Sequence, residues 1–217
     1  MPRRTRVTRE AILETAAHII SETGAASMTF QRLGEALGVT KQAIIYWFPS
    51  KSDLTRALIV PALELEADAV VGGLKRIKTA PRAIEMFVRS LVAFHLEDLG
   101  RFRLIYVSAQ FDTQVWQVAE LPRVAAPIHA ATGRMYAALE SVLAQAPDFA
   151  DPAAARRAAV ATHMAAVGAL SMLSLADAIH DPLAHAPDVL IDALIALLTG
   201  RMIKPKRPAR ARREASG

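Results

Sequence analysis

In the opening part of the chain, hydrophobic and polar positions recur with the period of an α-helix, and the pattern predicts three short helices. The first helix is expected over residues 9–23, where Ile12 and Ile20 belong to an apolar stripe and Gly24 provides a stop signal. Such a stripe allows a helix to rest on its neighbours. The pattern therefore indicates a small helical unit at the amino end.

A tight turn joins the second and third helices. Thr29 precedes the second helix as a cap, because its hydroxyl can accept a hydrogen bond from a free backbone N–H. Gly38 ends that helix, since glycine enters the left-handed conformation without steric cost. Thr40 can cap the third helix, which turns Ile44 and Phe48 inward and leaves its polar start outside. This is the helix-turn-helix layout, in which the second helix of the pair enters the DNA major groove.

The next residues have the pattern of a capping box that opens a further helix. Ser50 is the expected cap, and Asp53 can reach back to the Ser50 N–H. Lys51 lies in the first turn, where the helix dipole disfavours a positive charge by about 0.3–1 kcal/mol, so a phosphate partner would explain it. The first-turn amides after Thr29 offer the same anion a second donor group. Helix–glycine–helix pairs are common in all-α proteins, however, so the layout alone is a weak indication.

Taken in order, these residues resemble the tetracycline-repressor-like (TetR/AcrR) family of bacterial transcriptional regulators. The matching positions, which cover roughly the first quarter of the chain, are the opening helix with Gly24, then Thr29, Leu33, Gly38-Val39-Thr40-Lys41, and Phe48-Pro49-Ser50-Lys51 with Leu54. The resemblance implies an all-α fold with an N-terminal three-helix helix-turn-helix DNA-binding domain. It also implies a C-terminal helical domain for ligand binding and dimerisation.

Two positions depart from the family pattern. The family usually has alanine where Gly34 stands, which is a small loss of helix propensity. It usually has tyrosine, a phosphate contact, where Ile45 stands, and here Tyr46 or Trp47 can supply that contact instead.

The start of the third helix supplies the candidates for reading bases. Lys41 and Gln42 can donate to guanine or adenine, and the Ala43 methyl can meet a thymine methyl. Phosphate contacts would set the register without reading the sequence. The full set of candidate DNA-binding residues is Thr29, Thr40, Lys41, Gln42, Ala43, Tyr46, Trp47 and Lys51.

Pro61 lies within the helix that begins at Ser50. Proline removes a backbone donor and clashes with the preceding turn, at a cost of about 3 kcal/mol or more. We therefore expect a kink or break near residue 60, with the helix resuming to about residue 78.

Further helices are predicted beyond this point, with Gly100 closing the first and Asp188 capping the last. Residues 112–122 are ambiguous. The expected helices cover residues 80–99, 101–110, 127–146, 153–180 and 188–200. The expected divisions are a DNA-binding domain over 1–56, a ligand-binding and dimerisation domain over 57–203, and a basic disordered tail over 204–217.

The last two expected helices, 153–180 and 188–200, are apolar on more than one face. One face can pack on the core of the same chain while another needs a second apolar surface. A homodimer in which these helices and their mates form a four-helix bundle meets that need, and the family resemblance implies the same interface. Residues 158–176 carry no charge and are long enough to span a bilayer, but their alanines and polar residues favour a buried helix over a membrane span.

The amino-acid composition of the chain is typical of a helical protein. Hydrophobic residues make up 53% of the chain and aromatic residues only 6%, so alanine, leucine and valine supply most of the apolar surface. The absence of cysteine excludes disulfides and thiolate metal sites. Together with an arginine-rich amino end that lacks an apolar secretion signal, it predicts a cytoplasmic location.

Charge is distributed unevenly. Residues 1–56 hold eight Lys and Arg against five Asp and Glu, residues 57–200 hold eleven against fifteen, and residues 201–217 hold seven against one. Basic ends and an acidic middle suit a protein whose ends meet a polyanion. For the tail, a solubilising extension explains the charge equally well.

Enzyme motifs are missing: the sequence has no HExxH, glycine-rich phosphate loop or nucleophile elbow. Asp177, His180, Asp181 and His185 could bind a divalent ion, but a solvated loop beside helix ends explains them as well. We therefore expect no catalytic residues, no metal and no cofactor.

The body contains polar and aromatic side chains among small residues, a composition typical of a small-molecule site. Any single aromatic at helical spacing is more often core, but the family resemblance implies an effector pocket in this region. The candidate ligand-binding residues are Phe94, His95, Phe102, Tyr106, Gln110, Trp116, His129, Tyr136, His163 and Met172.

The leading hypothesis is a dimeric repressor that binds palindromic operator DNA and is released by a small, mostly apolar effector. The alternative is a DNA-binding regulator without an effector, controlled by a protein partner or by abundance. A third reading, a helical enzyme or membrane-surface protein, makes the helix-turn-helix resemblance accidental.

Overall fold

The computed structural model describes residues 7–24, 27–107, 121–149 and 151–200. Every regular element in these ranges is a helix, which confirms the predicted all-α class. In chain order they are α1 (Arg9–Thr23), α2 (Phe30–Leu37), α3 (Lys41–Trp47), α4 (Lys51–Leu74), α5 (Ala80–Leu96), α6 (Leu99–Phe102), η2 (Arg103–Val107), α8 (Leu121–Leu143), η4 (Pro147–Phe149), α9 (Pro152–Ala178) and α10 (Pro187–Leu198).

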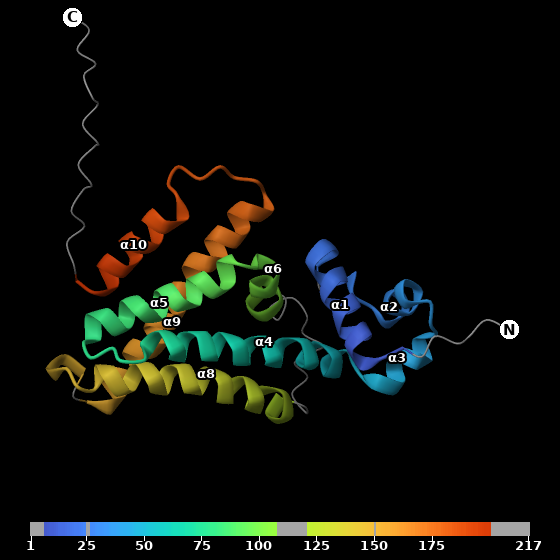
Figure 1. The fold of residues 1–217 in the computed structure, drawn as a ribbon, viewed down its shortest axis with the longest axis horizontal. Helices are drawn as coiled ribbons and strands as arrows, with labels where there is room; N and C mark the ends of the chain where they lie inside the picture. Colours follow the sequence, from blue (N-terminus) through green and yellow to red (C-terminus); the bar gives the residue numbers. More distant parts are fainter. Residues whose placement is uncertain (1–6, 25–26, 108–120, 150, 201–217) are drawn as a thin grey trace, which may run out of the picture.

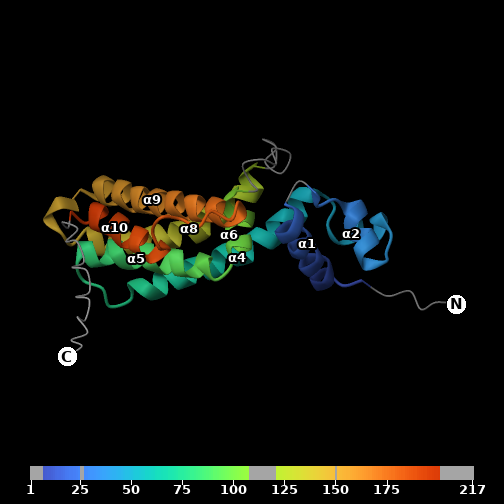
Figure 2. The same ribbon diagram turned by 90° about the horizontal axis from the view of Figure 1, so that it is seen from above.

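The long helix α4 joins two parts of the molecule (Figure 1). Helices α1, α2 and α3 gather around its amino end. The rest of α4 packs against α8 and α5, which in turn pack against α9. Figure 2 shows the same arrangement from above, with the α1–α3 unit projecting from the end of the helical body. Because α4 belongs to both parts, a shift of this helix in the body would move the α1–α3 unit.

The α1–α3 unit is held together by apolar side chains that belong to one buried cluster, which continues into the body. The Thr8 hydroxyl accepts a hydrogen bond from the Ala11 N–H at 3.2 Å and so caps α1. Ile12 and Ile20 are buried, as their places in the apolar stripe predict, and Leu33 of α2 is also fully buried. The N-terminal helices are therefore fixed by local caps and by packing within this buried cluster.

A kink or a break was predicted near residue 60, and of the two the break is wrong, because α4 is one helix of 24 residues that contains Pro61. Pro61 is exposed, so the carbonyl that loses its helical partner can be hydrated. Ile59 and Leu63 on either side are buried. Their burial, at roughly 1.5–3 kcal/mol each, outweighs the cost of the proline. The helix ends at Leu74, before the predicted residue 78, and Arg76 adopts a left-handed conformation with φ of 68°.

Helix α5 ends at Leu96 and does not extend to residue 99. Asp98 begins α6 instead, because its carboxylate accepts a hydrogen bond from the Arg101 N–H at 3.0 Å. Gly100, expected as the stop of α5, lies inside α6. The following turn, η2, has the wider π-helical hydrogen-bonding pattern. The predicted helix over 101–110 is thus a short α-turn followed by a π-turn, and its end lies outside the described residues.

Helix α8 begins at Leu121 and does not begin at Pro127. Pro122 occupies its first turn, where the missing N–H has no helical partner to lose. Pro127 is tolerated inside the helix. Sequence reasoning chose the wrong one of two prolines as the start signal.

The last helices match the expected order with different caps. The Asp151 carboxylate caps α9 by accepting hydrogen bonds from the Ala153 and Ala154 N–H groups at 3.0 and 3.2 Å. In α10, Pro187 takes the first position, so Asp188 lies in the first turn and is not the cap.

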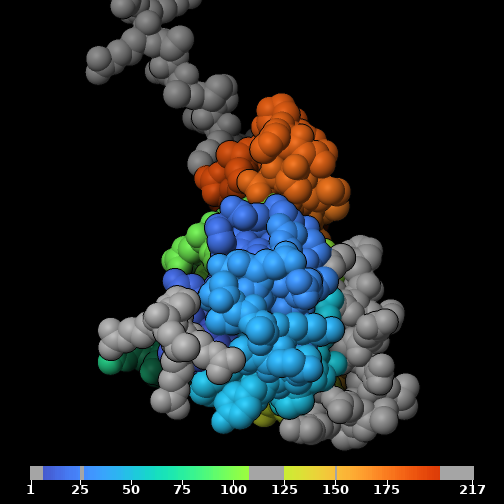
Figure 3. Space-filling model, turned by 90° about the vertical axis from the view of Figure 1, so that its right-hand side faces the viewer, coloured from blue at the N-terminus to red at the C-terminus, as the bar shows by residue number. Residues whose placement is uncertain are grey.

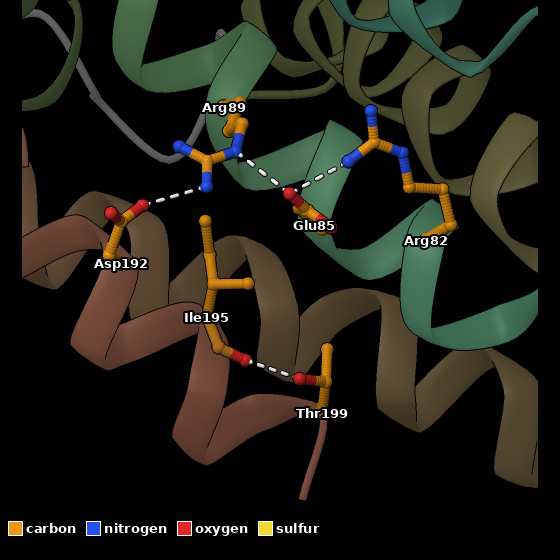
Figure 4. Close-up of polar contacts among 6 residues, drawn as sticks. All are labelled: Arg82, Glu85, Arg89, Asp192, Ile195 and Thr199. Atoms are coloured by element: carbon orange, nitrogen blue, oxygen red, sulfur yellow. Dashed lines mark hydrogen bonds and ion pairs between the residues drawn. The ribbon is translucent and has the colours of Figure 1, made fainter. Parts of the chain in front are cut away.

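Ion pairs hold α10 against α5 (Figure 4). The Arg89 guanidinium donates to Asp192 of α10 at 2.7 Å and to Glu85 of α5 at 3.1 Å. Arg82 contacts Glu85 from the other side at 2.8 Å. Ile195 of α10 is buried beneath these groups.

Within the part of the chain that the structure describes, α9 is the one helix long and apolar enough to cross a membrane. Of the relevant window, 39% is buried against the rest of the molecule. The core helix of a globular protein meets the same criteria of length and composition.

Candidate nucleic-acid interface and ligand site

The α2–turn–α3 segment has the backbone geometry of a helix-turn-helix. The Thr29 hydroxyl accepts a hydrogen bond from the Arg32 N–H at 3.1 Å and caps α2. Gly38 takes the left-handed conformation with φ of 65°, which ends α2. The Thr40 hydroxyl then accepts from the Ala43 N–H at 3.3 Å and caps α3. Each predicted cap is present.

Gly34 has a steric role that helix propensity alone does not reveal. A side-chain Cβ at this position would lie 2.7 Å from the Val39 carbonyl oxygen. The Val39 N–H also donates to the Gly34 carbonyl at 2.8 Å, so the turn folds directly back onto α2. The absence of a side chain permits this close approach.

Helix α3 is anchored by its apolar face. Ile44 and Phe48 are buried in the core of the α1–α3 unit, while Lys41 and Gln42 are exposed and Ala43 is half-buried. This unit forms the end of the molecule that faces the viewer in Figure 3. The polar start of α3 is therefore accessible to a macromolecular partner.

Tyr46 and Trp47, the two candidates for the phosphate contact that Ile45 cannot make, differ in their surroundings. Tyr46 is 80% exposed, and Trp47 is 37% exposed. Trp47 lines a hollow of about 750 Å³ together with Arg9 and Pro61, on the side where α3 meets α4. Tyr46 is thus the more accessible of the two for a phosphate contact.

The start of α4 carries the predicted serine cap. The Ser50 hydroxyl accepts from the Asp53 N–H at 3.1 Å and lies 2.8 Å from the Asp53 carboxylate, to which it donates. The Asp53 carboxylate therefore contacts the Ser50 hydroxyl. The sequence predicted a contact with the Ser50 N–H instead. Arg56 binds the other Asp53 oxygen at 2.7 Å. Lys51 is the first residue of the helix and is half-buried.

In the body, five polar side chains form one hydrogen-bonded chain, which we name the Glu66 cluster: Glu66, His95, Tyr106, Tyr136 and His163. The Glu66 carboxylate accepts from the Tyr106 hydroxyl at 2.6 Å, and its other oxygen is 2.8 Å from His95 Nε2. His163 Nε2 lies 3.0 Å from the Tyr106 oxygen, and its Nδ1 lies 2.7 Å from the Tyr136 oxygen. The chain links α4, α5, η2, α8 and α9.

Burial shifts the pKa values of Tyr106, His163 and Tyr136 in the direction that favours their neutral forms. It raises the pKa of Tyr106 well above its ordinary value, and the adjacent Glu66 carboxylate adds to this effect. Burial lowers the pKa of His163, which the Glu66 charge opposes. Burial also raises the pKa of Tyr136, against the effect of Arg156. A neutral His163 with its proton on Nε2 donates to Tyr106 and accepts from Tyr136, which satisfies both ring nitrogens.

The predicted ligand residues separate into three groups. His95, Phe102, Tyr106, Tyr136 and His163 come together, with the Phe102 and Tyr106 rings stacked at 5.3 Å. Phe94 is half-buried beneath the Arg101 guanidinium, 3.8 Å from the ring centroid. His129 and Met172 are exposed on α8 and α9, away from the cluster. Gln110 and Trp116 lie outside the described residues.

Sequence reasoning missed two members of this region, Glu66 and Phe87. Glu66 is wholly buried and Phe87 lies beside His163, with ring centroids 6.0 Å apart. The spacing of residues in the sequence contained a signal for Glu66, because this residue falls on the same helical face as Leu63 and Val70, which are both buried. A carboxylate on an apolar stripe indicates a polar partner in the core.

Comparison with known proteins supports the N-terminal geometry. Residues 12–58 match the family model for bacterial regulatory proteins of the tetR family, which spans α1, α2, α3 and the start of α4. The amino-terminal part of the chain, from α1 to the start of α4, is thus assigned to the tetR family of bacterial regulatory proteins. This match supports a transcriptional regulator that binds DNA.

Among curated proteins, the regulator is similar to the nucleoid occlusion factor SlmA of Glaesserella parasuis serovar 5 (strain SH0165), with 26% identity over 98 residues. The match covers 45% of this chain and 48% of SlmA, so it spans about half the length of that relative. Two solved structures share the fold over nearly their whole length. The tetR-family regulator PfmR of Thermus thermophilus has a TM-score of 0.60 and 21% identity, covering 92% of this chain and 100% of PfmR. A tetR-family protein of Rhodococcus RHA1 has a TM-score of 0.61 and 16% identity, covering 89% and 97%.

The outer faces of α9 and α10 expose large apolar side chains. Met172 is 66% exposed on α9, and Leu197 is 74% exposed on α10. Between the two helices lies an apolar groove of about 260 Å³ that includes Met172, Leu190 and Ile191. No group of three or more His, Cys, Asp or Glu side chains in the described ranges is arranged to hold a metal ion. Asp177, one of the predicted metal candidates, instead pairs with Arg103 at 2.5 Å.

Proposed function

We propose that this tetR-family regulator is a ligand-responsive repressor. It binds palindromic operator DNA as a homodimer in the cytoplasm, and a small, mostly apolar effector releases it. The single observation that carries the proposal is the placement of α3, whose Ile44 and Phe48 are buried while Lys41 and Gln42 are exposed.

In the proposed complex, α3 lies in the major groove. Lys41, Gln42 and Ala43 face base edges, where the two polar side chains donate to guanine or adenine and the methyl group meets thymine. Tyr46 and Lys51 hold phosphates and set the register of the helix in the groove. Thr29 and Thr40 cap the N-termini of α2 and α3, and the N–H groups at these helix ends also bind DNA phosphates.

The proposed dimer buries the outer faces of α9 and α10 against their mates in a four-helix bundle. Support comes from the exposed Met164, Met172, Leu175 and Leu197, since contiguous apolar surface of this kind favours association. A two-fold dimer presents two copies of α3 to half-sites that are one or more helical turns apart.

The proposed effector site is the aromatic centre of the body around the Glu66 cluster. Because Glu66 lies on α4, which also begins beside α3, a ligand there can favour one position of α4 over another. Release of DNA then follows from the different affinities of the ligand for the two dimer shapes. The alternative, a regulator without an effector that responds to a protein partner or to its own abundance, predicts the same DNA interface and no ligand response.

A gel-shift titration tests the proposal. The full-length protein is titrated onto duplexes that tile the region upstream of its own gene, at low and at moderate salt, with a scrambled duplex as control. Retention of one palindromic fragment at a lower protein concentration than the scrambled control supports sequence-specific binding. Equal retention of all fragments, or none, overturns it. Addition of metabolite pools to the specific complex then separates an effector-controlled regulator from the alternative.

A further inference from the structure

Glu66 is a wholly buried carboxylate whose basic partner, among the described residues, is the imidazole of His95 alone. Among the described residues it forms no salt bridge with lysine or arginine, and its two oxygens contact only Tyr106 and His95. By contrast Glu85, the other acidic residue of the body core, is paired with Arg82 and Arg89. A buried carboxylate normally has a full counter-charge, because leaving water is costly for an ion.

The surroundings of Glu66 suit a positive charge. Phe102 and Tyr106 stack beside His95, and the rings of Tyr106, Tyr136 and Phe87 surround His163. Aromatic faces attract cations, most strongly where water is excluded. An anionic ligand would instead meet the carboxylate in the same low-dielectric space.

His95 offers a second group for a ligand. Its Nε2 is committed to Glu66, while its Nδ1 is buried and has no hydrogen-bond partner in the described part of the chain. With the proton on Nε2, Nδ1 is a free acceptor. A ligand whose N–H donor reaches Nδ1 can satisfy this acceptor, which removes a desolvation penalty.

Of the residues around Glu66, Tyr106 is the one best placed to be displaced by a ligand. It lies in η2, the π-helical turn Arg103–Val107, and π-helical turns occur preferentially at functional sites. Its phenol ring fills the space between Phe102 and His163 and donates its hydroxyl to Glu66. Displacing that ring exposes one Glu66 oxygen and opens a space the size of a phenol, walled by aromatic rings.

We propose that the effector is a small aromatic amine in its protonated form, whose ammonium group replaces the Tyr106 hydroxyl on Glu66 and whose ring takes the place of the Tyr106 ring. The inference rests on the proposed function, because it assigns a chemical class to that effector. Binding breaks the bond between α4 and η2, so the ligand favours a state in which α4 is no longer held by Tyr106.

Benzylammonium is the probe, because it carries a positive charge on a ring of the required size. Benzyl alcohol is its nearly isosteric neutral counterpart, and benzoate is the anionic one. Binding to the full-length protein is measured by calorimetry at millimolar ligand, pH 7 and matched ionic strength. We expect benzylammonium to bind at least about tenfold more tightly than benzyl alcohol, with benzoate binding most weakly.

Three conservative variants connect that preference to the cluster. Glu66→Gln keeps the shape and removes the charge, so it should abolish the preference for the amine. Tyr106→Phe removes the competing hydroxyl and should tighten benzylammonium binding. Glu64→Gln removes a charge from an exposed position of the same helix, outside the Glu66 cluster, and serves as the matched control with unchanged preference.

The proposal of an amine effector and the proposal of a repressor can be refuted independently. Absent or equal binding of benzylammonium and benzyl alcohol, or an unchanged preference in Glu66→Gln, overturns the amine assignment. In that case a protonated His95 already balances Glu66, or the effector binds elsewhere. The repressor proposal is overturned independently, when the ligand-free protein does not select an operator in the gel shift.

Discussion

Glu66 on α4 and His95 on α5 are both wholly buried, and their Oε2 and Nε2 atoms lie 2.8 Å apart. A buried pair of this kind contributes little net stability, because the cost of desolvation offsets most of the attraction. Its effect is positional, since it fixes α4 against the body at a point 15 residues after Lys51, the first residue of the helix. The helix that supports the α1–α3 unit is therefore held in the body by a buried polar contact.

Lys51→Ala should weaken binding to every DNA sequence. The lysine is proposed to contact a phosphate, which carries no sequence information. We expect the slope of log affinity against log salt concentration to fall by about one unit. Titrations on specific and scrambled duplexes at several salt concentrations measure this effect. An unchanged salt slope would remove Lys51 from the interface.

Gln42→Ala should change which sequence is preferred. Gln42 is exposed at the start of α3, where its amide can make a paired contact with adenine. Loss of such a contact costs about 1–3 kcal/mol at one base pair and little elsewhere. Binding selection from a randomised half-site measures the preference, and a uniform loss on all sequences would contradict a base-reading role.

Leu197→Glu should prevent dimer formation. Leu197 is 74% exposed on α10, and a carboxylate there would be buried without a partner in the proposed bundle, at about 3 kcal/mol or more. The dimer dissociation constant should rise at least about a hundredfold by light scattering or sedimentation. Leu65→Glu, at a position 59% exposed on α4, is the matched control and should leave the assembly intact.

His163 should make stability depend on pH. Burial holds the pKa of His163 below its ordinary value, so the unfolded chain takes up a proton at a higher pH than the folded one. The stability that depends on neutral His163 is present above about pH 6.5 and is lost as the pH falls below it. Urea denaturation at about pH 7.5 and pH 5 should show a smaller loss for His163→Asn than for the unaltered protein. An equal loss in both would refute the assignment.

Gly34→Ala should destabilise the α1–α3 unit by about 1–3 kcal/mol. The new Cβ would lie 2.7 Å from the Val39 carbonyl, so the turn would have to move. Gly72→Ala is the matched control, because nothing lies within 4 Å of a Cβ there. It should stabilise α4 by about 0.5–1 kcal/mol, as expected for glycine in a helix. Thermal denaturation of the two variants shows whether a steric clash or helix propensity determines the effect of replacing Gly34.

The helix-turn-helix could be predicted from sequence because its signals are local. Thr29, Gly38 and Thr40 act on backbone groups within a few residues of themselves, and the structure confirms each cap. The periodic burial of Ile44 and Phe48 is equally short-range. The same local reasoning was wrong at Pro61 and Pro127. A proline in the sequence shows which backbone hydrogen bond a helix would lose, but it does not show the tertiary packing that can offset this loss.

By itself, the amino-acid sequence determined the all-α class, the family resemblance of the amino-terminal segment and the position of α3. These follow from caps and periodicities that operate over one or two helical turns. Tertiary structure alone decided that α4 continues through Pro61 and that Glu66 meets His95 and Tyr106 in the core. Those outcomes depend on the packing of residues 29 and 40 positions apart in the chain, which no local pattern specifies.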